Sequence, residues 1–250
     1  MDWRASYNLG KSIREKLESS KTDIEQSLGK KLYLRSYDLS GIFYDLALII
    51  SRINEDGAQV NRREELFEIA HDRMWTDEEE KELEGLGNYL VLDVKTLYIN
   101  IMIFMDALAY FLSLCVRSRK QPISKSFAKF KKDLENYRGR EIEEIREKIY
   151  EKTAWLDEAK DFRDDFIVHQ PAARSTLEFL NGVLHIPLTT RKKGYDQRHI
   201  IVGATARNIS IVEIDSSLTQ LKELLEELSE YLCQRLNMLP FEAEYCGERS

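Results

Sequence analysis

The stretch from Asn88 to Arg117 constrains the fold most, because it is apolar on nearly every face of the helix that it predicts. Such a helix must be covered by other elements, so we expect it at the centre of a helical bundle. Its most apolar part, Leu97 to Val116, contains Asn100 and Asp106. An aspartate near the middle of a bilayer is costly, so we predict a buried core helix and no membrane span.

Amphipathic helical patterns lie on both sides of this stretch. We predict further helices at about 11–27, 31–54, 62–74, 125–137 and 141–170, and one more from 215 onward. Gly29 and the Asp56-Gly57 pair are expected to end the first two of these helices. Thr76 and Glu79 have the spacing of a capping box, which predicts a helix start just before the central stretch.

The hydrophobic period changes from 3.6 to 2 beyond Pro171. Two alternating segments, Thr176–Leu180 and Val183–Leu188, flank Asn181-Gly182, which is a strong signal for a β-hairpin. The segments His199–Gly203 and Asn208–Glu213 resemble two more strands. We therefore expect a small antiparallel sheet at 175–214, inserted before a last helix that Asp215 caps.

The predicted fold class is mainly α: an up-and-down helical bundle with a small antiparallel β-hairpin or sheet before the C-terminal helix. We expect a single domain over residues 1–250, with 240–250 as a flexible tail. The three cysteines, Cys115, Cys233 and Cys246, are far apart, which fits a reducing compartment. The N-terminus is too charged for a signal peptide, so we expect a cytoplasmic protein.

The formal net charge of −7 excludes binding of nucleic acid by bulk electrostatics, so any such binding must be local. The four histidines include one Glu-x-x-His spacing, Glu68 to His71, but a carboxylate di-iron site needs a second. His185 and His199 lack further ligands at metal spacing. No metal site and no cofactor are predicted.

Two polar side chains interrupt the inward stripe of the predicted helix at 141–170. The stripe runs through Ile142, Ile145, Ile149, Thr153, Leu156 and Ala159. In the same phase, Arg163 and His169 flank Phe166, about 9 Å apart along the helix axis. Pro171 forbids continuation of the helix, so both side chains would serve one site at its end.

This Arg-x5-His spacing, with Asp164 directly after Arg163, resembles the HEPN superfamily (higher eukaryotes and prokaryotes nucleotide-binding). That resemblance implies an all-helical bundle over roughly residues 30–170 with the last helix. It also implies a metal-independent endoribonuclease whose homodimer brings two Arg/His pairs into one cleft. A toxin or phage-defence role would add an antitoxin or other protein partner. One toxin branch has Tyr where this chain has Pro171, so membership of that branch is not expected.

The residue types suit RNA cleavage by the RNA's own 2′-hydroxyl. His169 can act as base or acid, because an unperturbed imidazole has a pKa of about 6.5. Arg163 can hold the phosphate oxygens bidentately, and Asp164 can orient either of them. The alternative is a structural pair, in which His169 interacts with the helix dipole and Arg163 with neighbouring aspartates.

A basic loop between the predicted strands offers a second RNA contact. It contains Arg191, Lys192 and Lys193, with Arg198 close behind. These cations would follow an RNA backbone, or they form an ordinary solvated hairpin loop. The competing function for the whole chain is a non-catalytic module that dimerises or binds another protein through its helices.

Overall fold

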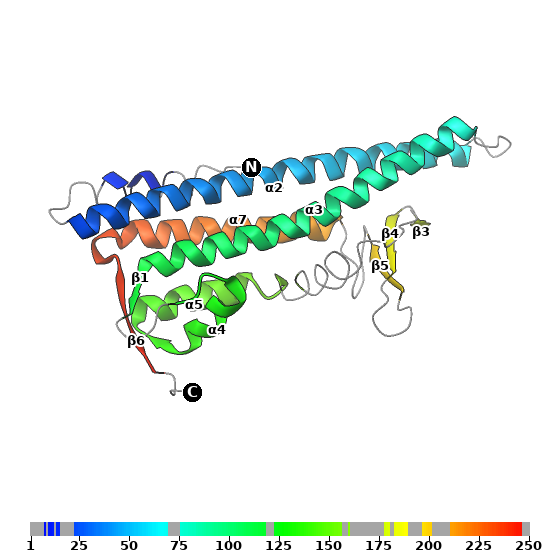
Figure 1. Cartoon of the computed structure of the whole chain (residues 1–250). Helices are drawn as coiled ribbons and strands as arrows, with labels where there is room; N and C mark the ends of the chain where they lie inside the picture. Colours follow the sequence, from blue (N-terminus) through cyan, green and yellow to red (C-terminus); the bar gives the residue numbers. More distant parts are fainter. Residues whose placement is uncertain are drawn as a thin grey trace. The chain divides into compact units, whose positions relative to one another are not determined.

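The computed structural model describes residues 8, 10–12, 14–15, 23–69, 76–118, 123–156, 160, 178–180, 183–189, 197–201 and 211–246. Most of these residues are helical, and the strands among them form two small three-stranded sheets (Figure 1). The prediction of a mainly α protein with a small sheet before the C-terminal helix is confirmed. The chain divides into two compact units: Met1–Asp45, Asn100–Trp155 and Thr219–Ser250 form the first, and Leu46–Ile99 and Leu156–Leu218 the second.

Two long helices, α2 (Asp23–Ile69) and α3 (Asp77–Cys115), contain much of the buried apolar surface. The predicted stops at Gly29 and at Asp56-Gly57 are wrong, because α2 runs through both. A glycine inside a helix costs about 1 kcal/mol relative to alanine, a cost that packing of the buried face offsets. Gly29 and Gly57 both lie on that buried face.

The predicted capping box at the start of α3 is confirmed. The backbone N–H of Thr76 donates to the Glu79 carboxylate at 2.9 Å, and the N–H of Glu79 donates to the Thr76 hydroxyl at 3.3 Å. These two bonds satisfy donors that the first turn of a helix leaves without an intrahelical partner.

In the first unit, α4 (Phe127–Glu135), α5 (Arg140–Lys152) and the later part of α7 (Ile211–Gln234) are amphipathic. The rings of Phe43 in α2 and Phe104 in α3 pack with their centroids 5.7 Å apart. The predicted inward stripe of α5 is buried at Ile142, Ile145 and Ile149. Helix α7 also buries a stripe at helical spacing: Leu221, Leu225, Leu228 and Leu232.

The expectation of one helix over 141–170 is wrong, because α5 ends at Lys152. Thr153 leaves the helical region at φ −121° and ψ 13°, and its hydroxyl donates to the carbonyl of Ile149. A hydroxyl that bonds back to the preceding turn competes with continuation of the helix. Leu156 is still buried, but the helical phase cannot be carried across the break to later residues.

The C-terminal residues also depart from expectation, since Phe241–Tyr245 forms strand β6 and not a flexible tail. It pairs in parallel with β1 (Val116–Ser118) and antiparallel with β2 (Tyr137–Arg138). A 3-10 turn, η2 (Leu236–Met238), precedes it. The Phe241 ring is 2% exposed and lies 6.2 Å from the Tyr231 ring, so burial of this side chain anchors the strand.

The second unit contains the other sheet, with strand order β3-β4-β5. The predicted hairpin is confirmed by β3 (Glu178–Leu180) and β4 (Val183–Thr189), which pair antiparallel on either side of residues 181 and 182. Strand β5 (Gln197–Ile201) pairs with β4 and begins two residues earlier than predicted.

The fourth predicted strand, Asn208–Glu213, is wrong at residues 211–213, where α7 has already begun. Residues 208–210 lie outside the described residues. Asp215 is inside α7 and therefore does not cap it. Ile214, Leu218 and Leu221 follow Ile211 after three, seven and ten residues, which is a helical spacing.

By length and composition, α3 alone among the helices of the described ranges is apolar enough to cross a membrane. Of its most apolar window, 56% is buried inside the protein, and core helices of soluble proteins pass the same test.

Candidate functional site

The residues that the sequence singles out lie mostly beyond the part of the chain that the structure describes. Arg163, Asp164 and His169 fall in this category, and so do Arg191, Lys192 and Lys193. Arg198 lies in β5, where its backbone pairs with Leu188 of β4. The structure does describe helix α5, which precedes the Arg163/His169 segment in the chain.

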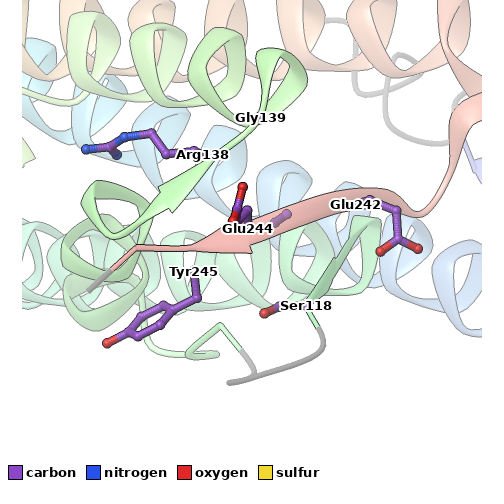
Figure 2. A pocket seen from close by; sticks show the side chains of 7 residues that line it. Ser118, Arg138, Gly139, Glu242, Glu244 and Tyr245 are labelled. Carbon is purple, nitrogen blue, oxygen red and sulfur yellow. The ribbon is translucent and has the colours of Figure 1, made fainter. Parts of the chain in front are cut away.

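A surface pocket of about 470 Å³ lies beside the β1-β6-β2 sheet (Figure 2). Its lining consists of Ser118, Arg138, Gly139, Glu242, Ala243, Glu244 and Tyr245. Gly139 has φ +143°, a backbone conformation that side chains rarely adopt, and a Cβ there would meet the Glu242 carbonyl oxygen at 3.3 Å. Arg198, the one predicted site residue within the described ranges, is not among the residues that line this pocket. Strands of two and three residues give no periodic signal, so the sequence could not have indicated it.

The guanidinium group of Arg138, which lines this pocket, is held by backbone carbonyl groups. Arg138 donates through one guanidinium nitrogen to the carbonyl oxygens of Glu135 and Tyr137, at 2.7 and 3.1 Å. These bonds position the guanidinium, while Glu242 and Glu244 of β6 add two carboxylates to the lining. The pocket therefore offers polar recognition groups, and among the described residues no histidine or cysteine lines it.

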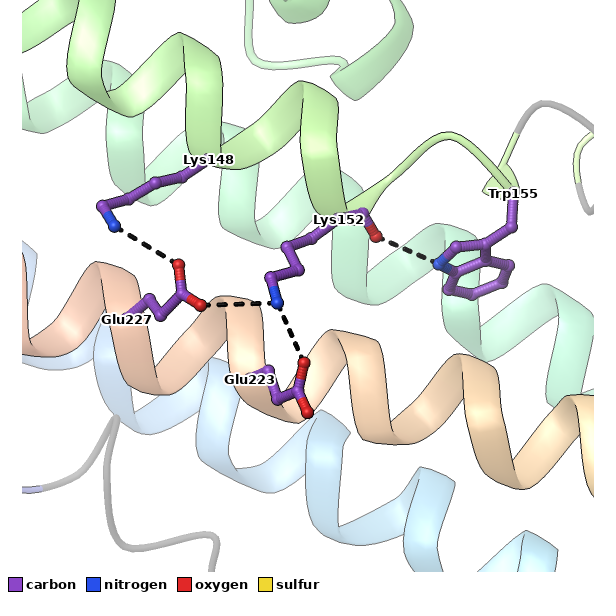
Figure 3. A network of polar contacts seen from close by, with 5 residues as sticks. All are labelled: Lys148, Lys152, Trp155, Glu223 and Glu227. Atoms are coloured by element: carbon purple, nitrogen blue, oxygen red, sulfur yellow. Dashed lines mark hydrogen bonds and ion pairs between the residues drawn. The ribbon is translucent and has the colours of Figure 1, made fainter.

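The end of α5, from which the chain enters the Arg163/His169 segment, is fixed to α7 by ion pairs (Figure 3). Lys148 Nζ lies 3.3 Å from a carboxylate oxygen of Glu227. Lys152 Nζ lies 2.9 Å from Glu223 and 3.4 Å from the other Glu227 oxygen. The Trp155 indole N–H donates to the Lys152 carbonyl at 3.1 Å, which satisfies a carbonyl at the helix end.

These contacts shift the ionisation of both partners in the direction that favours the charged pair. The hydrogen bond to Glu223 is the main cause of the raised pKa of Lys152, and the charges of Glu223 and Glu227 add to it. Partial burial acts to raise the pKa of Glu227, but the hydrogen bonds and charges of Lys148 and Lys152 outweigh it and lower that pKa.

A second junction between α5 and α7 lies near the start of α5. Glu144 accepts from Arg140 at 3.0 Å and from Arg235 at 3.1 Å, and the hydrogen bond from Arg140 is the main cause of its lowered pKa. The Tyr231 hydroxyl donates to the Glu141 carbonyl at 3.3 Å. Burial, followed by its contact with Glu144, raises the pKa of Tyr231. The two junctions hold α5 against α7 near both ends of α5.

Asp106 in α3 and Asp45 in α2 differ in their contacts. Asp106 accepts the N–H of Phe127, the first residue of α4, at 2.8 Å, and so acts as a cap from a distant helix. Asp45 is exposed on α2. Among the described residues, no group of three or more His, Cys, Asp or Glu side chains is placed to hold a metal ion.

Comparison of the chain with models of protein families, with curated proteins and with solved structures found no match in any of the three.

Proposed function

We propose that the protein is a metal-independent endoribonuclease of HEPN type that works in the cytoplasm as a homodimer. The observation that carries this proposal is the Arg163-x5-His169 motif, with Asp164 beside the arginine, in a chain that is mainly helical.

In the proposed reaction, the RNA 2′-hydroxyl attacks the adjacent phosphorus and the 5′-oxygen leaves. His169 removes the hydroxyl proton or protonates the leaving oxygen, with the His169 of a second copy taking the complementary role. Arg163 neutralises the charge that builds up on the non-bridging oxygens, and Asp164 orients Arg163 or His169. Arg191, Lys192, Lys193 and Arg198 would contact the RNA backbone.

The test is an RNA-cleavage assay in the presence of chelator. We expect the parent to cut, and His169→Ala and Arg163→Ala each to lose about 10²-fold or more in rate. Lys160→Ala, three residues before Arg163, is the matched control and should cut as the parent does. No cleavage by the parent, or equal cleavage by His169→Ala, would remove the catalytic proposal.

A second candidate is a non-catalytic module that binds another copy or another protein, such as an antitoxin. An exposed apolar stripe on α2 favours it: Leu34, Tyr37 and Tyr44 are 52%, 59% and 50% exposed. They follow one another at intervals of three and seven residues, which places them on one side of the helix. This candidate is favoured if the parent cuts no RNA while Tyr37→Lys/Tyr44→Lys abolishes self-association. Cleavage that requires His169 would exclude it.

A further inference from the structure

A local excess of positive charge surrounds α4, in contrast to the acidic character of the whole chain. Between Ala107 and Lys132 the sequence has no acidic residue and seven basic ones, although the formal net charge of the protein is −7. The basic residues are Arg117, Arg119, Lys120, Lys125, Lys129, Lys131 and Lys132. This stretch is therefore a place where the chain can attract a polyanion locally.

The buried apolar side chains of α4 and its exposed lysines lie on different sides of the helix. Phe127, Phe130 and Leu134 are buried, whereas Lys129 and Lys132 are exposed. Residues three apart on a helix share a face, so these two ammonium groups start about 4.5 Å apart along the axis. Within the described part of the chain, neither lysine has an ion pair with a carboxylate.

Two further cations extend the same surface through one aromatic ring. Lys125 Nζ lies 4.5 Å from the centroid of the Tyr110 ring, and the Arg35 guanidinium lies 4.6 Å from it. Cation–π contacts of this kind hold a charged group in place without neutralising it. Arg35 also pairs with Asp38 at 2.7 Å, whereas Lys125 has no ion pair with a carboxylate within the described part of the chain.

Two carboxylates of α4 make hydrogen bonds with groups other than these lysines. Asp133 accepts the N–H of Ser124 at 2.9 Å, and Glu135 accepts the Tyr150 hydroxyl at 2.7 Å. Asp106 occupies the N-terminal end of α4, so an anion would not be bound at the helix terminus itself. Within the described residues, ammonium groups without a carboxylate partner are therefore present at Lys125, just before α4, and at Lys129 and Lys132 on its exposed side.

We propose that Lys125, Lys129 and Lys132 form an RNA-binding face that contacts the sugar–phosphate backbone of a duplex, an inference that rests on the proposed ribonuclease function. Compact ammonium groups suit phosphates, and no large apolar side chain of α4 is exposed to anchor a protein or to insert into a membrane. The ring of Tyr110 is engaged by two cations, so the face lacks a free platform for stacking bases. It would hold RNA regardless of sequence while cleavage occurs elsewhere.

The test measures binding of a fluorescein-labelled RNA duplex by anisotropy over a range of salt concentrations, in a His169→Ala background that keeps the RNA intact. Lys125→Gln/Lys129→Gln/Lys132→Gln should weaken binding about tenfold or more. It should also reduce the slope of log K against log salt by roughly 2 to 3, the value for three lost phosphate contacts.

The matched control is Lys30→Gln/Lys31→Gln/Lys81→Gln, which removes three exposed lysines elsewhere and changes the net charge equally. It should bind RNA almost as the background protein does. Equal binding by the α4 variant, an equal loss in the control, or binding of phosphatidylserine vesicles without binding of RNA would each overturn the inference. Lysine-dependent RNA binding by a parent that never cuts RNA would support this face and refute only the proposed catalysis.

Discussion

At the scale of single residues, the carboxylates of this protein differ mainly in the groups that they contact. Asp106 takes over the cap of α4, since the side chain of Ser126 at the N-cap position makes no capping hydrogen bond. We expect Asp106→Ala to lower the free energy of unfolding by about 1 kcal/mol, because the Phe127 N–H loses its acceptor. Chemical denaturation measures this difference. Asp45→Ala, on an exposed position, should change it by less than about 0.5 kcal/mol, and equal effects would contradict the capping role.

The Glu227 carboxylate gives the protein a predictable response to acid. Its pKa is lowered from the ordinary 4.5 in the folded state, so its stabilising contribution is present above 4.5 and is lost as the pH falls through the folded-state value. At pH 7, Glu227→Gln should cost about 0.5 to 1 kcal/mol, a small value because the group is 37% exposed. Denaturation at pH 7 and at pH 3 should show this difference shrinking. Glu151→Gln, at an exposed position of α5, is the control. A stability difference between Glu227→Gln and the parent that grows on acidification would refute the lowered pKa of Glu227.

At the scale of elements, β6 carries one large buried side chain, Phe241. Phe241→Ala should destabilise the protein by about 3 to 5 kcal/mol, since a buried ring is lost and a cavity remains. Glu242→Ala on the same strand is exposed and should have little effect. Thermal unfolding of both variants compares them directly. A Phe241→Ala protein as stable as the parent would mean that the strand does not hold the C-terminus.

The sequence predicted helices and the hairpin well but placed several ends wrongly. Buried stripes in α5 and α7 were predictable because helical periodicity reports which side chains leave water. The position of a helix end also depends on local hydrogen bonds and packing that compete with the helical conformation. Hydrophobic periodicity does not report these. Gly29 and Gly57 did not stop α2, whereas Thr153, an unremarkable residue in the sequence, ends α5. The prediction for Arg163 and His169 has the same weakness, because their positions on one helix face were extrapolated from α5 beyond its end at Thr153.

At the scale of the whole molecule, the proposed function requires two copies of the chain, and the exposed stripe on α2 is a surface through which they can associate. Sedimentation equilibrium should give about twice the chain mass of 29.3 kDa. Tyr37→Lys/Tyr44→Lys should shift it towards the monomer, since charges replace apolar contact area. Glu151→Lys on α5 should leave the mass unchanged. A monomeric parent would contradict a shared Arg/His cleft.

The most direct test of the proposed chemistry uses a defined RNA in chelator and its copy with a single 2′-deoxynucleotide on the 5′ side of the cut. Attack by the 2′-hydroxyl predicts a 2′,3′-cyclic phosphate on the 5′ product, no cleavage of the deoxy-substituted copy, and loss of cleavage in His169→Ala. Cleavage of the deoxy-substituted copy at the same position, or cleavage that survives His169→Ala, would contradict the account.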